Sequence, residues 1–247
     1  MKRTDAMQTM KLHILGMNGP FPAPGGATSG YLVTCGGTAV QLDLGTGTLA
    51  ALTAKMPPEE LTALVFSHWH YDHCSDALPL TYRLQATGKT LDVWGPEDDR
   101  SPVRAALAAD PGIRLHTLRL GDTVTLGGLT LTAFTARHPV PALMLRLTDG
   151  ARTLCYTGDT NTVDGLVTFA QGADLLLADG LFTRALWDEK KPHLSAALCA
   201  EAAKEAHVRR LVLTHLNPMI DPALLLAEAR EIFPDTELAV KGQVYTV

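Results

Sequence analysis

The sequence predicts an α/β domain that contains two sheets, and three observations support this prediction. Short apolar runs rich in β-branched and large aliphatic residues recur along the chain, which is typical of buried strands. Helical patterns alternate with these runs in both halves. The 247 residues, of which 46% are hydrophobic, contain no linker, charge block or low-complexity stretch that would divide them. We therefore expect a single domain over residues 1–247, with a loose leader over residues 1–10.

Both halves of the chain show the same order of elements. Each half begins with hairpin-type strands and continues with strands and helices in alternation. The predicted strands are Leu12–Leu15, Tyr31–Cys35, Ala39–Leu42, Leu64–Phe66, Leu115–Leu120, Thr123–Leu126, Leu129–Phe134, Ala142–Leu147, Thr153–Tyr156, Leu175–Leu177, Leu211–Leu213, Glu237–Val240 and Val244–Val247.

Three helices are predicted from apolar spacing and from capping residues. The first spans Ser75–Thr87, where leucines and an alanine fall on one side. The second spans Ser195–His207 and opens with a serine that can cap its free N–H groups. The third begins at Asp221-Pro222, a cap residue followed by proline at the first helical position, and runs towards Phe233.

Composition limits the classes of function. The formal net charge of −5 argues against a broad nucleic-acid binder, which would need a basic face. No apolar run approaches the roughly 18 residues of a membrane span, and no signal-peptide core follows Met1. The four cysteines lie far apart with no CxxC spacing, so we expect reduced thiols and a cytoplasmic protein.

A cluster of metal-binding residue types follows the predicted strand Leu64–Phe66. His68, His70, Asp72 and His73 occupy four of six consecutive positions, although the whole chain holds only nine histidines. Imidazole nitrogens and carboxylate oxygens are ligands that borderline cations such as zinc prefer. In an extended or turning backbone, His68 and His70 project to one side, while Asp72 and His73 reach a different point. The segment therefore predicts two neighbouring metal ions.

This HxHxDH segment after a hydrophobic strand resembles the signature of the metallo-β-lactamase superfamily. The resemblance implies an αββα four-layer sandwich with a dinuclear metal site at one edge of the sheets. It also implies that His138 completes the first set of ligands and His215 the second, and that Asp159 bridges both metals. Zinc is the expected metal on softness and availability, with manganese and iron as alternatives.

Within the superfamily, residues 173–182 and the His193-Leu194-Ser195 segment resemble the ribonuclease Z branch. The resemblance implies that His193 protonates the leaving oxygen as general acid and that Asp179 orients it. Asp72 would help to orient or deprotonate the attacking water. The chain departs from that branch where Ala178 replaces a histidine and Asp179 a glutamate. It also lacks the arm that grips transfer RNA, because only two predicted strands and an Asp149-Gly150 turn separate His138 from Asp159.

The expected function is a dinuclear metal-dependent hydrolase, and specifically a phosphodiesterase. Hydroxide generated at the metals would attack a small phosphodiester such as a cyclic nucleotide or a short oligonucleotide. We expect no large structured RNA as a partner and no membrane, whereas the resemblance suggests a homodimer. One alternative is a carboxyl-ester, lactone or thioester hydrolase on the same metals. Another is a non-catalytic metal-binding protein.

Overall fold

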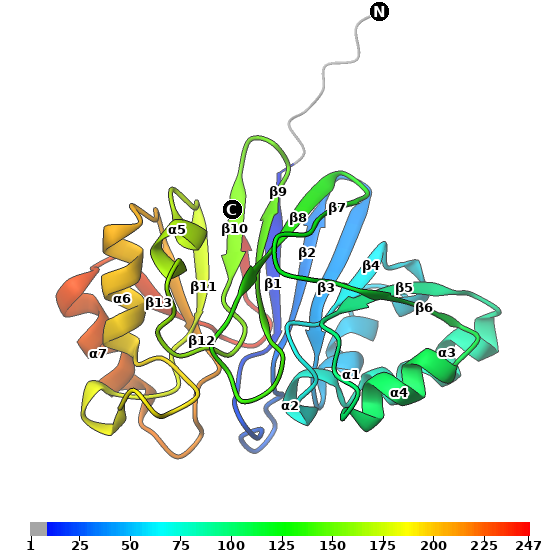
Figure 1. Cartoon of the computed structure of the whole chain (residues 1–247), viewed down its shortest axis with the longest axis horizontal. Helices are drawn as coiled ribbons and strands as arrows, with labels where there is room; N and C mark the ends of the chain where they lie inside the picture. Colours follow the sequence, from blue (N-terminus) through cyan, green and yellow to red (C-terminus); the bar gives the residue numbers. More distant parts are fainter. Residues whose placement is uncertain (1–8) are drawn as a thin grey trace, which may run out of the picture.

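Two seven-stranded sheets lie face to face between two layers of helices in the computed structural model, which describes residues 9–247 (Figure 1). The helices α1 to α4 cover the outer face of one sheet, and α5 to α7 cover the outer face of the other. This arrangement confirms the predicted αββα sandwich.

The first sheet has the strand order β14-β1-β2-β3-β4-β5-β6. Its first pairs are antiparallel, and the pairs from β3 to β6 are parallel. Its strands are β1 (Lys11–Gly16), β2 (Gly30–Cys35), β3 (Thr38–Leu44), β4 (Ala63–Val65), β5 (Leu91–Gly95), β6 (Ile113–Thr117) and β14 (Val244–Thr246), and its helices are α1 (Thr48–Thr53), α2 (Tyr71–Cys74), α3 (Ala77–Thr87) and α4 (Pro102–Ala109).

The second sheet repeats this plan with the order β13-β12-β11-β10-β9-β8-β7. Antiparallel strands β7 to β10 are followed by parallel pairs from β10 to β13. Its strands are β7 (Thr123–Leu126), β8 (Leu129–Thr135), β9 (Leu143–Thr148), β10 (Thr153–Tyr156), β11 (Leu175–Asp179), β12 (Leu211–Thr214) and β13 (Thr236–Leu238), its helices are α5 (Leu166–Ala170), α6 (Ala196–Glu205) and α7 (Pro222–Ile232), and short 3₁₀ helices occupy Pro58–Glu60 and Arg184–Leu186.

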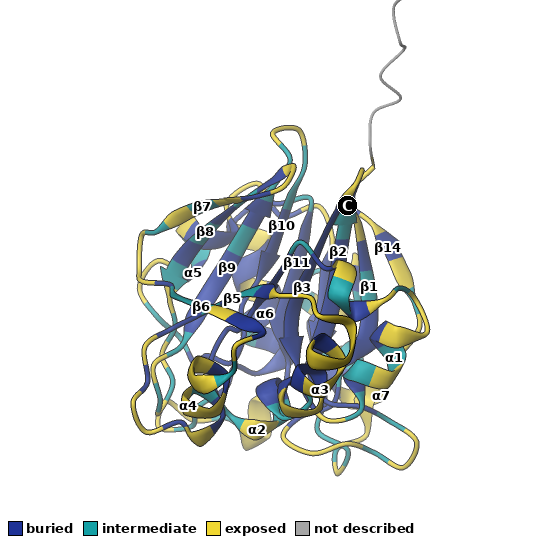
Figure 2. Cartoon of the chain, turned by 90° about the vertical axis from the view of Figure 1, so that its right-hand side faces the viewer, coloured by how far each residue is buried: buried dark blue, intermediate teal, exposed yellow. Residues whose placement is uncertain are grey.

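Alternating side chains of the parallel strands enter different cores, because successive strand residues point to opposite faces. In β4 and the residue after it, Val65 packs in the core between the sheets, whereas Leu64 and Phe66 pack beneath the helices. In β11, Leu177 faces the other sheet and Leu176 faces the helices. Strands covered on both faces read as continuous apolar runs, and Figure 2 shows them as the buried centre of the molecule.

The predicted helix caps are confirmed. The side chain of Ser195 accepts a hydrogen bond from the N–H of Leu198, and that of Asp221 accepts one from Ala223. The first predicted helix begins too early, because a turn at Ser75 and Asp76 separates α2 from α3, which begins at Ala77. Strand β5 and the helices α1, α2, α4 and α5 were not predicted.

The expected leader over residues 1–10 is wrong at its last residue, Met10. Met10 is fully buried in the core between the sheets, and its carbonyl accepts a hydrogen bond from the N–H of Val247. Residues 1–8 lie outside the described part of the chain. Within the described residues, no helix has the length and apolar character needed to cross a membrane.

Candidate metal centre

The histidine-rich segment lies where β4 gives way to the short helix α2. His68 follows the end of the strand, and His70 is the last residue before the helix. Asp72 and His73 lie within the first turn of α2. The change from extended chain to helix turns the second pair of side chains away from the first, as the two-metal prediction requires.

Loops of the second sheet bring the remaining candidates to the same place. His138 comes from the loop after β8, and Asp159 from the loop after β10. Asp179 is the last residue of β11, His193 precedes α6, and His215 directly follows β12. The parallel strands β10, β11 and β12 end at the same edge of their sheet, so their neighbouring loops converge there.

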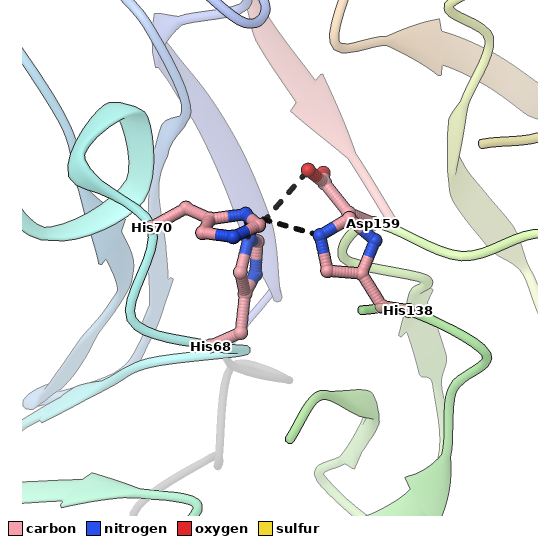
Figure 3. Close-up of side chains that lie close together, drawn as sticks. All are labelled: His68, His70, His138 and Asp159. Atoms are coloured by element: carbon pink, nitrogen blue, oxygen red, sulfur yellow. Dashed lines mark hydrogen bonds and ion pairs between the residues drawn. The ribbon is translucent and has the colours of Figure 1, made fainter. Parts of the chain in front are cut away.

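The first cluster contains His68, His70, His138 and Asp159, with ligand atoms that all lie within 4.8 Å of one another. Figure 3 shows their side chains converging from both sheets. Nε2 of His68 lies 3.1 Å from Nδ1 of His70, which in turn lies 3.0 Å from Nε2 of His138. A carboxylate oxygen of Asp159 lies 3.6 Å from Nε2 of His68.

The second cluster contains Asp72, His73, Asp159 and His215, again within 4.8 Å. Nε2 of His215 lies 3.1 Å from Oδ2 of Asp72 and 3.4 Å from Oδ2 of Asp159. Nε2 of His73 lies 3.1 Å from Oδ1 of Asp159. Asp159 thus belongs to both clusters, which is the position expected of a bridging ligand.

His193 and Asp179 lie directly beside these clusters. Nδ1 of His193 is 2.8 Å from Oδ2 of Asp179, and both residues are buried. The His193 ring stacks on that of His215 with centroids 4.9 Å apart. Asp179 also accepts hydrogen bonds from the N–H groups of Thr160 and Leu181, so its carboxylate is held in place. The structure therefore brings together every residue that the sequence singled out for the site.

Asp43 was not predicted as a site residue, yet its carboxylate contacts His73 of the second cluster. Its Oδ2 atom is 2.8 Å from Nδ1 of His73 and accepts hydrogen bonds from the hydroxyls of Ser67 and Tyr156. Its Oδ1 atom accepts from the N–H of Ser67. The available signal was an acidic residue near the end of the apolar run Ala39–Leu44, where a buried charge needs partners.

Hydrogen bonds also orient the imidazoles of the first cluster. Nδ1 of His68 lies 3.1 Å from the hydroxyl oxygen of Ser67, and Nδ1 of His138 donates to the carbonyl of Pro192. The other nitrogen, Nε2, of each ring is thereby free to face the cluster. Such contacts fix the tautomer and orientation of a ligating histidine.

The backbone at Gly19 packs closely against the imidazole of His215. A Cβ atom on Gly19 would lie 2.1 Å from Nε2 of His215. Any side chain at position 19 would therefore displace this imidazole from the second cluster. The Gly/Pro-rich loop after β1 thus serves to let the chain pass close to the site.

Two effects shift the pKa values of the site residues: burial, which disfavours the charged form, and attraction between opposite charges. Burial alone would raise the pKa of Asp159, but His215, His73 and His68 hold it well below the usual range. Burial lowers the pKa of His68 well below its ordinary value. For His215, attraction to the carboxylates of Asp159 and Asp179 overcomes the effect of burial and raises the pKa to about 10.

The donor set fits two divalent cations. Among residues 9–247, Nε2 of His73 and Oδ1 of Asp159 find no hydrogen-bond partner, although both atoms are buried and lie only 3.1 Å apart. Unpartnered buried polar atoms are costly, and a cation between them would offset that cost. Imidazole and carboxylate ligands in two sets that share one aspartate are consistent with a dinuclear metal site. The assignment of each ligand stays a prediction.

The cysteine next to the motif does not join the clusters. The Sγ atom of Cys74 donates a hydrogen bond to the carbonyl of Trp69, and the residue is fully buried beneath the helices. Lys191, which also lies near His193 in sequence, bonds the carbonyl of Leu186 and places its ammonium group over the ring of Phe182.

Residues 39–216 match the model of the β-lactamase superfamily domain. The chain is 32% identical over 247 residues to a Bacillus subtilis protein named as a probable metallo-hydrolase, YhfI, and the match covers 96% of this chain and 99% of that one. It is 32% identical over 240 residues to an uncharacterised Mycobacterium tuberculosis protein, Rv1339, covering 91% and 87%. A ribonuclease Z of Archaeoglobus fulgidus is 26% identical over 293 residues, covering 93% and 95%.

Solved structures show the same architecture. The crystal structure of Bacillus subtilis YhfI superposes with a TM-score of 0.93 at 31% identity, covering 97% of this chain and 100% of that one. Human tRNase Z, short form, superposes with a TM-score of 0.77 at 21% identity, covering 96% and 99%. At that lower identity, the likeness concerns the fold alone.

Proposed function

Because this chain belongs to the metallo-β-lactamase superfamily, we propose that it is a metal-dependent hydrolase that cleaves a small phosphodiester. The observation that carries the proposal is the His193–Asp179 pair beside the two clusters, with Nδ1 of His193 2.8 Å from Oδ2 of Asp179. Hydrolysis of a phosphodiester requires a proton for the leaving oxygen, and this pair can supply it. The relative named ribonuclease Z, whose name describes an enzyme that cuts RNA, supports the same class of bond.

The two clusters would bind the cations, and the cations would in turn bind the phosphate of the substrate. His68, His70 and His138 form one set of ligands, Asp72, His73 and His215 the other, and Asp159 serves both. Bound divalent cations lower the pKa of water and stabilise the negative charge that grows on an attacked phosphorus centre. The side chain of Asp72 is 11% exposed, more than that of Asp159, so Asp72 is the carboxylate better placed to orient an incoming water.

His193 would protonate the leaving oxygen from its Nε2 atom, because Nδ1 faces Asp179. The carboxylate fixes this tautomer and stabilises the cationic ring before the transfer. The loop that carries His193 is held in turn, since Nε1 of Trp187 donates to the carbonyl of His193 at 3.1 Å. The proton donor is therefore positioned before the substrate arrives.

A small substrate is favoured by what surrounds the site. His138 and Asp159 are linked by β9, β10 and a tight turn at residues 149–152, so no arm projects between them to hold a large RNA. The formal net charge of −5 also disfavours a broad contact with nucleic acid.

The test compares metal-loaded variants in the hydrolysis of bis(p-nitrophenyl) phosphate. We expect Asp72→Ala and His73→Ala to abolish turnover. His193→Ala should lower kcat by about 10²- to 10⁴-fold, the usual contribution of a general acid, for a phosphodiester with an alkoxide leaving group such as a cyclic nucleotide. Its effect on bis(p-nitrophenyl) phosphate should be smaller, because p-nitrophenolate leaves without being protonated. His116→Ala is the matched control, since His116 bonds Asp92 on the outer strands and should leave the rate unchanged.

Two outcomes would contradict the proposal. Unchanged turnover in Asp72→Ala or His73→Ala would show that the metal clusters take no part in the reaction. Hydrolysis of p-nitrophenyl acetate or a thioester that does not depend on His193, with no hydrolysis of the phosphodiester, would assign the site to ester chemistry instead.

A further inference from the structure

A cavity of about 330 Å³ opens beside the first cluster, and His70 forms part of its lining. Residues from the histidine-rich segment form one side, and residues from the loop after β5 form another. Its lining includes Trp69, His70, Tyr71, Asp98, Arg100 and Val140. We call this cavity the ring pocket. Because it shares an imidazole with the first cluster, a group bound there would be attached close to the reacting phosphorus.

Two aromatic side chains form one part of the lining: Trp69 is held in place by its contacts, whereas Tyr71 is exposed. Trp69 is only 4% exposed, its Nε1 atom donates to the carbonyl of Pro96 at 2.7 Å, and its ring packs on Phe66. Tyr71 is instead 63% exposed, and no hydrogen bond within the described residues holds its hydroxyl. An exposed tyrosine next to a cluster imidazole offers an apolar ring face on which a planar group can stack.

A second part of the lining combines the guanidinium of Arg100 with the buried carboxylate of Asp98. Oδ1 of Asp98 accepts hydrogen bonds from the backbone N–H of Arg100 at 3.0 Å and from its Nε at 3.1 Å. The rest of the Arg100 guanidinium is exposed and planar, so it too can stack on a ring. Asp98 is 7% exposed, and its second carboxylate oxygen has no donor among the described residues.

We propose that the ring pocket binds the nucleobase of the substrate, so that the phosphodiester cleaved at the clusters is a nucleotide. This inference rests on the proposed function and names its substrate class. Stacking on Tyr71 and Arg100 selects a planar ring, and the free oxygen of Asp98 selects a base with an exocyclic amino group. The volume lies at the small end of the range for ligand sites, which suits one base and excludes a stacked oligonucleotide.

The experiment measures kcat/KM of the metal-loaded protein for three p-nitrophenyl phosphodiesters. They carry adenosine 5′-phosphate, inosine 5′-phosphate or methyl phosphate as the second group. Since a stacked base contributes about 1–3 kcal/mol, we expect kcat/KM for the adenosine ester to exceed that for the methyl ester by roughly 5- to 150-fold. The adenosine ester should also exceed the inosine ester, and Asp98→Asn should reduce that preference.

Variants separate stacking from a general loss of structure. Tyr71→Ala should lower the ratio of kcat/KM for the adenosine ester to that for the methyl ester, whereas Tyr71→Phe, which keeps the ring, should preserve it. Tyr82→Ala removes a comparably exposed tyrosine of α3, at 73% exposure, and should leave the ratio unchanged. An equal kcat/KM for the adenosine and methyl esters in the wild-type protein would overturn the inference, as would a ratio that Tyr71→Ala does not change.

Binding distinguishes failure of the ring pocket from failure of the proposed function. Titration of the metal-loaded protein with adenosine 5′-phosphate and with ribose 5-phosphate requires no turnover. Tighter binding of adenosine 5′-phosphate that Tyr71→Ala removes would support the ring pocket even if no phosphodiester were cleaved. Equal binding of the two compounds, with bis(p-nitrophenyl) phosphate still hydrolysed, would overturn the ring pocket and leave the phosphodiesterase proposal intact.

Discussion

At the residue scale, the second cluster depends on Asp43, because this carboxylate holds both His73 and the segment that carries His68. Each of its oxygens has a partner, and the positive φ of 51° at Asp43 directs its side chain into the site. Asparagine tolerates the same left-handed backbone, so it removes the charge without adding strain. An amide offers only one acceptor oxygen and therefore cannot satisfy the same donors.

We expect Asp43→Asn to weaken binding of Zn²⁺ by about 10- to 100-fold, the usual effect of losing an outer partner of a metal ligand. Calorimetric titration of the metal-free protein with zinc chloride measures this change. Asp164→Asn alters an exposed aspartate outside the site and serves as the control. Wild-type zinc affinity in Asp43→Asn would show that His73 does not need this support.

The residue scale also shows why part of the site could not be predicted. The histidines and aspartates of the motif were predicted because four of them lie within six positions. Asp43, Ser67 and Tyr156 lack any such spacing, and only the packing of the two sheets brings Tyr156 to Asp43. Tyr71 and Trp69 have the same aromatic character in the sequence, yet one is exposed and the other buried, which the backbone direction decides.

At the element scale, prediction succeeded where a local signal was sufficient. Strands covered on both faces are apolar throughout, and the helices α6 and α7 begin with capping side chains. Strand β5 gave a weaker signal, because its five residues include Asp92 and end at Gly95, and both residue types are uncommon in strands. Helix α4 did carry a serine cap and a proline at its first turn, so its cap motif could have revealed it.

The pairing of β5 with β6 depends partly on an ion pair on their outer edge. Two of the three guanidinium hydrogen bonds of Arg114 reach Asp92 and the third reaches the hydroxyl of Thr90, while His116 contacts the carboxylate of Asp92. The hydrogen bond from Arg114 is the main reason that the pKa of Asp92 is lowered to about 2. A lowered pKa means that the folded state binds this proton less readily than the unfolded state does.

The stabilisation by Asp92 should therefore be complete above its ordinary pKa of 3.8 and disappear as the pH falls through about 2. Solvent screens this partly exposed pair, so we expect Asp92→Asn to lower the free energy of unfolding by less than about 1 kcal/mol at pH 6. Urea denaturation of both proteins at pH 6 and near pH 3 measures the difference. A difference that grows as the pH falls would contradict the assigned cause.

At the scale of the whole molecule, the site connects the two sheets. His68, His70, Asp72 and His73 extend from the first sheet, whereas His138, Asp159 and His215 extend from the second. Hydrogen bonds cross the same interface, since Tyr31 meets Thr214 at 2.7 Å and Tyr156 meets Asp43 at 2.6 Å. Cations held by both clusters would thus tie the halves of the sandwich together.

Removal of metal should therefore destabilise the fold as well as stop turnover. A ligand present at 100 times its Kd stabilises the native state by about 2.7 kcal/mol. We expect treatment with EDTA followed by dialysis to lower the Tm, and added zinc chloride to restore it. His73→Ala should show a smaller recovery. A Tm that responds to neither chelation nor zinc would argue against a metal bridge between the sheets.

The sequence by itself determined the repeated order of strands and helices and the histidine-rich segment, and its resemblance to a family pointed to the later residues that join the two clusters. These features depend on neighbouring positions or on a family pattern, so they can be read along the chain. Only the tertiary structure decided that Asp43 supports His73, that Asp179 reaches both His193 and His215, and that Tyr71 faces a cavity. These contacts join residues far apart in the sequence, and they depend on how two separately built sheets pack against each other.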